Sequence, residues 1–374
     1  MRYYIIAGEA SGDLHASRLI RAIRLKDSNA EFRAWGGDLM QAEGATIIKH
    51  YKDLAFMGFS EVVANLRTIF KNMRFCKNDL LAYHPDAVIF VDYPGFNLPM
   101  AKFAKEKGYK TIYYISPQVW AWKEKRVKTI RKTVDKMLVI LPFEKAFYKK
   151  WNYETEYVGH PLIEIIDGFK SQHTVQKIRE ELGFEEGKKI IAILPGSRKQ
   201  EITKKLPIML AASRYFNNYL FVVAQASAIS DELINSFTSS YPNVKVVKGE
   251  TYKLLSISEA ALVTSGTATL ETALFDVPEV VCYKGSAISY AIGKRLIKVP
   301  YIALVNLIMN QPIVKELIQD DMSVEKMTLE LRKITEDEKA RSEMLEGYKR
   351  LIERLGGVGA SKKVAFLITE HLKK

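Results

Sequence analysis

Short apolar runs rich in β-branched residues recur along this chain, and segments with a helical spacing of apolar residues separate them. This alternation is typical of a parallel β-sheet whose strands are connected by helices. The first series of expected strands is 3–7, 31–35, 87–91, 110–115 and 137–140. The second series is 189–194, 219–224, 244–247, 261–264 and 279–282. We therefore expect an α/β fold with two doubly wound parallel sheets.

A hinge is expected at 159–170, between the two series. The prediction is a Rossmann-like domain at 1–165 and a second one at 166–360. The last helix, 361–374, follows a glycine-rich segment and is expected to pack back on the first domain. Because ligands of open α/β sheets bind at the carboxyl ends of the strands, two such domains facing across a cleft would gather the functional loops.

The composition narrows the class of protein. The chain has 374 residues, of which 48% are hydrophobic, which is enough for two large cores. Its formal net charge of +13 indicates an anionic partner, and without a nucleic-acid-binding motif we expect a membrane surface rather than nucleic acid. Cys76 and Cys282 are typical of buried thiols in a reducing compartment. With no signal peptide and no apolar run of about 18 residues, a cytoplasmic location is expected.

Two glycine-containing turns each follow an expected strand of the second domain, at 194–198 and 264–271. A turn of this kind lets backbone N–H groups approach an anion, and the positive end of the following helix adds to the attraction. Arg198 supplies a planar guanidinium that suits phosphate oxygens. Either turn alone is typical of an ordinary parallel sheet, but together they suggest one diphosphate held by two loops. The candidate residues are Gly196, Ser197, Arg198, Ser265, Gly266, Thr267 and Ala268.

Carboxylates at strand ends of the first domain are candidates for acid–base chemistry. Asp92 follows an apolar strand and precedes a Pro-Gly turn, so burial could tune its pKa for a general base; a role in capping the next helix is equally compatible. Glu9, Ser11, Gly12 and Asp13 form a second expected loop, for an acceptor or for a helix cap. The histidines are scattered and no Asp-x-Asp occurs, so we expect neither a metal nor a cofactor.

Two segments are candidates for membrane contact. If residues 123–137 form a helix, Lys125, Lys128, Lys132 and Lys136 share one face, which would be either simply solvated or in contact with anionic head groups. Phe56, Met57 and Phe59 lie in a short apolar segment that would either fill the core or contact acyl chains.

Taken together, these segments resemble the lipid-A-disaccharide synthases, bacterial glycosyltransferases of endotoxin synthesis. The most specific matches are Gly8-Glu9-Ala10-Ser11-Gly12-Asp13 and Trp120-Ala121-Trp122. The remaining matches are 57–62, 114–119, 141–144, 159–161, 194–198, 265–271 and 299–301. The resemblance runs in order from the first strand to about residue 319.

The resemblance implies a GT-B fold in which the second domain holds UDP and the first holds the acceptor. It implies transfer of 2,3-diacylglucosamine from UDP to 2,3-diacylglucosamine 1-phosphate, giving a β(1→6) disaccharide with inversion. Asp92 matches the family's proposed base, Glu271 a ribose-binding position and Asn306 a family site residue. Such substrates imply peripheral association with the inner membrane. The sequence does not determine whether the chain forms a homodimer.

One departure and two alternatives accompany this interpretation. The family usually has Leu-Pro-Asn where this chain has Leu304-Val305-Asn306, and we expect Val305 to loosen the turn that places Asn306. A UDP-sugar 2-epimerase would share the fold and the diphosphate site, but it would need more acid–base groups around one sugar. A non-catalytic basic protein that binds membranes peripherally is the second alternative.

Overall fold

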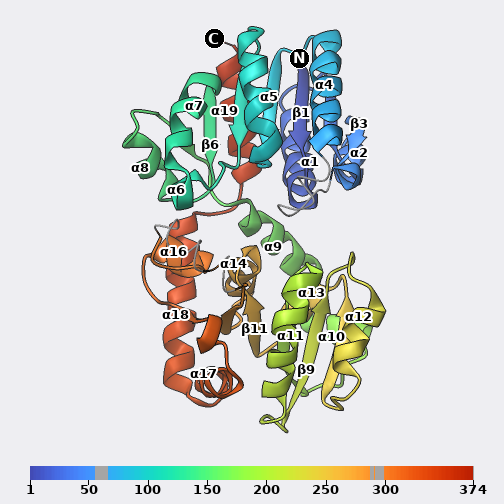
Figure 1. Ribbon diagram of the computed structural model, residues 1–374, viewed down its shortest axis with the longest axis vertical. Helices are drawn as coiled ribbons and strands as arrows, with labels where there is room; N and C mark the ends of the chain where they lie inside the picture. Colours follow the sequence, from blue (N-terminus) through green and yellow to red (C-terminus); the bar gives the residue numbers. More distant parts are fainter. Residues whose placement is uncertain (55–65, 287–289, 291–298, 374) are drawn as a thin grey trace. The chain divides into compact units, whose positions relative to one another are not determined.

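The computed structural model describes residues 1–54, 66–286, 290 and 299–373. The described chain divides into two compact units, each with its own parallel sheet (Figure 1). Unit 1 comprises Met1–Pro161 together with Val358–Lys374, and unit 2 comprises Leu162–Gly357. These divisions lie a few residues from the expected boundaries after 165 and 360.

Unit 1 contains a seven-stranded parallel sheet in the order β3-β2-β1-β4-β5-β6-β7. The strands are β1 (Arg2–Ala7), β2 (Glu31–Gly36), β3 (Thr46–His50), β4 (Ala87–Val91), β5 (Lys110–Tyr114), β6 (Lys136–Val139) and β7 (Glu156–Tyr157). Its helices are α1 (Ala10–Arg24), α2 (Asp38–Ala42), α4 (Leu66–Tyr83), α5 (Pro94–Glu106), α6 (Val119–Trp122), α7 (Val127–Thr133), α8 (Glu144–Lys149) and α19 (Ala360–Leu372). Short 3₁₀ turns are η1 (Tyr51–Asp53) and η2 (Glu124–Arg126).

The sheet of unit 1 is buried on both faces because its central strands are apolar at successive positions. Along β1, Tyr3 and Ile5 point into one core and Tyr4 and Ile6 into the other. The first core also takes in Val364, Ala365 and Ile368 of α19, which packs against α1. The last helix of the chain is therefore a structural part of unit 1.

Unit 2 contains a six-stranded parallel sheet in the order β10-β9-β8-β11-β12-β13. The strands are β8 (Lys189–Leu194), β9 (Tyr219–Gln225), β10 (Val244–Lys248), β11 (Ala260–Thr264), β12 (Glu279–Tyr283) and β13 (Lys315–Ile318). The helices are α9 (Pro161–Gln172), α10 (Val175–Leu182), α11 (Lys199–Ser213), α12 (Asp231–Thr238), α13 (Thr251–Ser256), α14 (Thr267–Leu274), α16 (Leu304–Met309), α17 (Val324–Glu336) and α18 (Glu338–Leu355); η3 (Gln319–Asp321) is a 3₁₀ turn.

In both sheets the strand order reverses beside the first strand, between β1 and β4 in unit 1 and between β8 and β11 in unit 2. This reversal defines the doubly wound fold, and the prediction of two such sheets is confirmed. The point of reversal leaves a crevice at the carboxyl ends of the strands, where the connecting helices run to opposite faces. Each sheet therefore offers a place for a ligand.

Two details of the sequence prediction are wrong. Residues 123–137 form η2, α7 and the start of β6 instead of one helix, so Lys136 belongs to a strand. The strands β3, β7 and β13 were not expected, because these outer strands are short and only partly buried and so lack a continuous apolar run.

A buried carboxyl group in unit 2, that of Glu279, should make the stability of the protein depend on pH. Glu279, at the start of β12, is completely buried, and neither carboxyl oxygen has a hydrogen-bond partner among the described residues. Burial raises the pKa of Glu279 well above its ordinary value. The pKa of Glu279 is therefore higher in the folded protein than in the unfolded chain. The contribution of Glu279 to the free energy of unfolding is fully favourable only below about pH 4, and it is lost as the pH rises.

We predict that Glu279→Gln makes the protein more stable than the wild type at pH 8, by about 1–3 kcal/mol, with a smaller difference at pH 5. Urea unfolding at the two pH values measures the difference. Glu346→Gln, at an exposed position of α18, is the control. An unchanged pH dependence in Glu279→Gln would contradict the account.

Candidate functional site

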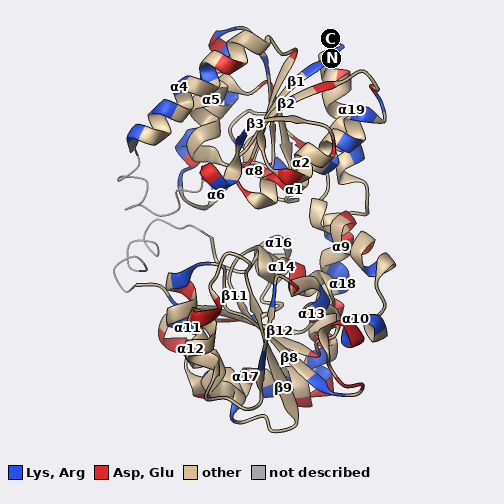
Figure 2. Cartoon of the chain, turned by 90° about the vertical axis from the view of Figure 1, so that its right-hand side faces the viewer, with Lys and Arg blue, Asp and Glu red and all other residues tan. Residues whose placement is uncertain are grey.

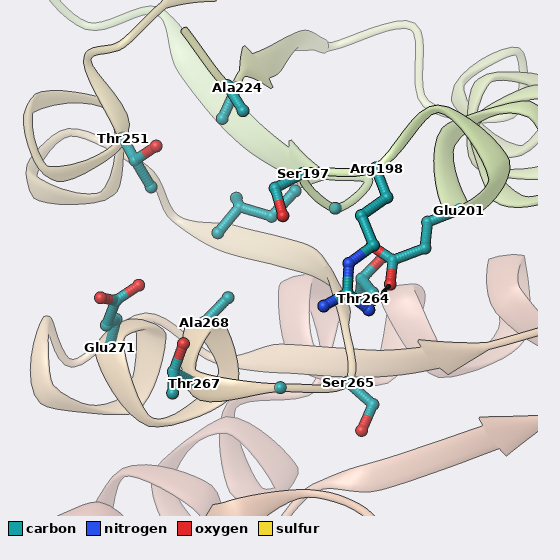
Figure 3. Close-up of a pocket in the computed structure, with 14 residues that line it drawn as sticks. Ser197, Arg198, Glu201, Ala224, Thr251, Thr264, Ser265, Thr267, Ala268 and Glu271 are labelled. Carbon is teal, nitrogen blue, oxygen red and sulfur yellow. Dashed lines mark ion pairs between the residues drawn. The ribbon is translucent and has the colours of Figure 1, made fainter. Parts of the chain in front are cut away.

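A cavity of about 430 Å³ lies at the carboxyl ends of β8 and β11 in unit 2 (Figure 3). The turn after β8 and the first turn of α14 supply most of its walls. Its lining includes these predicted residues: Gly196, Ser197, Arg198, Ser265, Gly266, Thr267, Ala268 and Glu271. The structure thus brings together two turns that are nearly 70 positions apart in the sequence.

Both turns depend on glycine. Gly196 has φ +109° and Gly266 has φ +153°, values that other residues rarely adopt. A Cβ atom at Gly196 would also collide with the Glu201 carboxylate. Gly266 is the N-cap of α14, so the first N–H groups of that helix, which lack acceptors within the helix, lie at the cavity. This arrangement suits an anion.

The charged side chains of the cavity form two groups, Arg198 with Glu201 and Glu271 with its partner Tyr252. Arg198 is mostly exposed, and its Nη1 lies 3.7 Å from Oε1 of Glu201, which sequence reasoning did not single out. Glu271 accepts a hydrogen bond from the Tyr252 hydroxyl at 3.1 Å, and burial raises the pKa of Glu271. An anion beside Arg198 would compete with Glu201 for the guanidinium.

Ser265 and Asn306 differ from the other predicted residues of this cavity. The Ser265 hydroxyl donates to the carbonyl of Ile302 at 2.9 Å and its N–H to that of Cys282 at 3.2 Å, so Ser265 holds the loop together. Asn306 is buried and is not among the lining residues. Its amide hydrogen-bonds Val314 and Glu316, each at 2.9 Å. The expected loosening at Val305 is therefore wrong, because Asn306 is fixed within α16.

A second cavity, of about 240 Å³, lies at the carboxyl ends of β4 and β5 in unit 1. It is lined by Asp92, Pro94, Trp122, Lys123, Arg126 and Glu144, together with 115–119, Ile140 and Leu141. Asp92 was expected at this edge of the sheet. Trp122, Lys123, Arg126 and Glu144 were not assigned a role there.

Asp92 is held rigidly by its backbone. Its carbonyl oxygen accepts hydrogen bonds from the Tyr113 hydroxyl at 2.6 Å and from the Asn97 amide at 2.7 Å, and its N–H donates to Tyr114 at 3.1 Å. Asp92, Tyr93 and Ile115 all have positive φ, an unfavourable conformation that needs such support. Tyr93 and not Asp92 occupies the N-cap position of α5. The side chain of Asp92 therefore lines the cavity instead of capping that helix.

Burial and the negative charge of Glu9 raise the pKa of Asp92 to about 6, and the Tyr93 N–H offsets part of this shift. Glu9 is the half-buried N-cap residue of α1. A carboxyl group with this pKa is largely ionised at neutral pH and is more basic than an exposed aspartate, as a general base should be.

The rest of the expected acceptor loop is part of the scaffold. Ser11, Gly12 and Asp13 lie in the first turn of α1, and Ser11 is exposed. The buried Asp13 carboxylate accepts three backbone N–H groups at the start of α2: from Gly37 at 2.8 Å, Leu39 at 3.1 Å and Met40 at 3.1 Å. These bonds give Asp13 a structural role at the start of α2, and its role in binding an acceptor stays a prediction.

Glu144 is a buried acid that sequence reasoning missed. It accepts hydrogen bonds from the Trp120 indole at 3.1 Å and from the N–H groups of Ile140 at 3.2 Å and Leu141 at 2.9 Å. Burial raises its pKa to about 7 despite these bonds. The only signal in the sequence was its place in the segment 141–144, which by itself suggests no role.

The structure describes the basic candidates for membrane contact but not the apolar ones. Lys125 lies in η2, and Lys128 and Lys132 lie on α7; all three are exposed. Phe56, Met57 and Phe59 lie outside the described residues. On α4 the aromatic side chains of Phe70 and Phe75 are 65% and 48% exposed. Basic residues accompany them along this helix (Figure 2).

Within the described ranges, no group of three or more potential ligands is placed to hold a metal ion. No described helix is long and apolar enough to cross a membrane.

Solved structures with the same architecture identify the fold. The UDP-GlcNAc 2-epimerase from Neisseria meningitidis, solved bound to UDP-GlcNAc, is similar over 100% of both chains, with a TM-score of 0.71 and 13% identity. CalG4, the calicheamicin glycosyltransferase, is similar over 100% of this chain and 99% of its own, with a TM-score of 0.62 and 13% identity. The fold is the GT-B fold of glycosyltransferases and related epimerases.

The sequence comparisons identify the family. The family model for lipid-A-disaccharide synthetase matches residues 3–368. The lipid-A-disaccharide synthases of Syntrophus aciditrophicus and Nitrosococcus oceani are each 38% identical to this chain over 99% of its length, covering 97% and 96% of those relatives. The chain belongs to the lipid-A-disaccharide synthase family and is a glycosyltransferase. The resemblance found in the sequence is confirmed, whereas the epimerases share only the fold.

The assignment of Asp13 to the scaffold leads to a prediction. Asp13→Ala leaves three N–H groups at the start of α2, two of them buried, without this acceptor, and we expect it to lower the free energy of unfolding by about 3 kcal/mol. The midpoint of urea unfolding measures the loss. Ser11→Ala, at the exposed position of the same turn, should change stability by less than about 0.5 kcal/mol. Equal stability of the two variants would contradict the assignment.

Proposed function

We propose that the chain transfers 2,3-diacylglucosamine from UDP to 2,3-diacylglucosamine 1-phosphate, giving the β(1→6) disaccharide 1-phosphate and UDP. The family supports the reaction, and the two cavities support a division of labour. Unit 2 binds the UDP-sugar and unit 1 binds the acceptor. The observation that carries the proposal is Asp92, a rigidly held carboxyl group with a raised pKa in the cavity of unit 1.

The larger cavity is proposed to hold the donor. Arg198 and the first N–H groups of α14 bind the diphosphate, and Glu271 binds the ribose. The epimerase of the same fold that was solved with UDP-GlcNAc supports a UDP-sugar ligand. As the bond to the sugar breaks, negative charge develops on the diphosphate, and these donors stabilise it without a metal ion.

The smaller cavity is proposed to hold the acceptor. Asp92 accepts the proton of the acceptor 6-hydroxyl while the hydroxyl oxygen attacks the anomeric carbon of the donor. The bond from that carbon to the diphosphate oxygen breaks in the same displacement, so the configuration inverts. The pKa of about 6 keeps Asp92 ionised at neutral pH and basic enough to assist.

A 2-epimerase is the weaker candidate. The epimerase structures are 11–14% identical in sequence to this chain, whereas the synthase relatives reach 38% identity over nearly the full length. Among the described residues, the cavity of unit 2 contains two carboxylates, Glu201 and Glu271, and no histidine. This set is poor in the acid–base groups that removal and return of a proton on one sugar would need.

Membrane association is proposed as peripheral, at the cytoplasmic face of the inner membrane. The substrates are acylated and anionic, and the chain has a net charge of +13. The exposed aromatic residues Phe70 and Phe75, with Arg67 and Lys71 on the same helix, combine apolar surface with positive charge. The exposed lysines of η2 and α7 add to that charge.

The proposed function predicts a specific effect of Asp92→Asn. We expect the wild type to convert the two substrates in neutral detergent with EDTA present, with UDP and the disaccharide followed by mass spectrometry. Asp92→Asn should lose about 100-fold or more in kcat, because no base accepts the proton, while UDP binding measured by calorimetry stays within about twofold. Normal turnover of Asp92→Asn would contradict the role of Asp92. UDP release without disaccharide would indicate a different acceptor.

A further inference from the structure

Two cations that have no role in the reaction described so far line the cavity that contains Asp92. They are Lys123, which follows α6, and Arg126, the last residue of η2. The Arg126 N–H donates to the Lys123 carbonyl at 2.9 Å, so one turn of backbone fixes their spacing. Both residues line the same cavity of about 240 Å³.

Trp122 orients these cations. The Lys123 ammonium lies 3.8 Å from the centre of the indole ring, and the Arg126 guanidinium carbon lies 6.0 Å from it. Cation–π attraction draws both groups to the ring, although like charges repel. Burial and the charge of Arg126 lower the pKa of Lys123, as expected for a cation that is not neutralised.

No carboxylate in the described part of the chain forms an ion pair with either cation. Besides Asp92, the carboxylate that lines the cavity is Glu144, whose oxygens accept bonds from Trp120, Ile140 and Leu141. Burial, the charge of Glu9 and the Tyr93 N–H shift the pKa of Asp92, and neither cation is among these causes. The cavity thus has a basic carboxyl group and, separate from it, a pair of cations.

We propose that Lys123 and Arg126 bind the phosphate monoester of the acceptor sugar and thereby place its 6-hydroxyl at Asp92. This inference rests on the proposed function and adds the residues that recognise the acceptor. A hexose 1-phosphate carries its phosphate on the ring carbon C1 and its 6-hydroxyl on the exocyclic carbon C6, so a cavity with a pair of cations and a base can bind both groups of one sugar. The guanidinium fork and the ammonium are suited to phosphate oxygens.

The same arrangement explains how the acceptor is distinguished from the donor. A phosphate monoester carries between one and two negative charges near neutral pH, whereas each phosphate of a UDP-sugar has one ester and one anhydride bond and carries one charge. Two adjacent cations therefore favour the monoester. Anionic head groups of the membrane carry related chemistry, and the test below separates the two sources.

The test combines a change in the enzyme with a change in the substrate. Lys123→Met and Arg126→Gln are assayed in neutral detergent micelles with two acceptors: 2,3-diacylglucosamine 1-phosphate and the same lipid without its phosphate. With the phosphorylated acceptor, each variant should lose about tenfold in kcat/KM, the value of one charge-assisted hydrogen bond. With the acceptor that lacks phosphate, each variant should match the wild type within about twofold.

Lys149→Met, at an exposed position of α8 outside the cavity, is the matched control and should behave as wild type with both acceptors. Lys123→Arg keeps the charge and should retain most of the preference for phosphate. Equal losses with both acceptors would show a structural role and overturn the inference, and so would unchanged kinetics. Variants that lose only binding to anionic vesicles would assign the cations to membrane head groups instead. Failure of the wild type to form any disaccharide would reject the proposed function itself.

Discussion

The backbone around Asp92 is the constraint on which the proposed chemistry of unit 1 depends. Two neighbouring strands and a helix contribute to it: Asp92 follows β4, and groups of β5 and α5 hold its peptide groups. The positive φ angles at Asp92 and Tyr93 are unfavourable and persist because these bonds and the packed sheet support them. The carboxyl group therefore stays in an environment poor in water, where burial and Glu9 raise its pKa.

Unit 2 has the same architecture as unit 1, but its cavity is suited to bind negative charge. Its strands also end in a crevice at the reversal of strand order, but here glycine turns and the start of a helix present N–H groups. The internal pair of Arg198 with Glu201 keeps a cation at the cavity in the absence of an anion. One sheet is thus suited to withdraw a proton from an acceptor, and the other to stabilise a departing diphosphate.

The central strands, both glycine turns and the place of Asp92 could be predicted because each is a local property: an apolar run, a glycine, a carboxylate at a strand end. The edge strands β3, β7 and β13 could not, because pairing rather than local hydrophobicity defines them.

Asp13 and Asn306 were placed in the sites because a polar side chain in a matching segment does not reveal its partners. The partners of Asp13 lie more than 20 positions away, and those of Asn306 lie beyond the end of its own helix. The cations beside Trp122 escaped notice because a long helix was expected over the same residues.

The central claim is that Asp92 acts as a base whose pKa is raised by burial and by Glu9. The pH dependence of kcat/KM, measured in the wild type and in Glu9→Gln, tests it most directly. The wild type should lose activity below an apparent pKa near 6, because Asp92 becomes protonated. In Glu9→Gln this loss should move to lower pH, because one of the negative charges that raise the pKa is gone. The same pH dependence in both proteins would contradict the account.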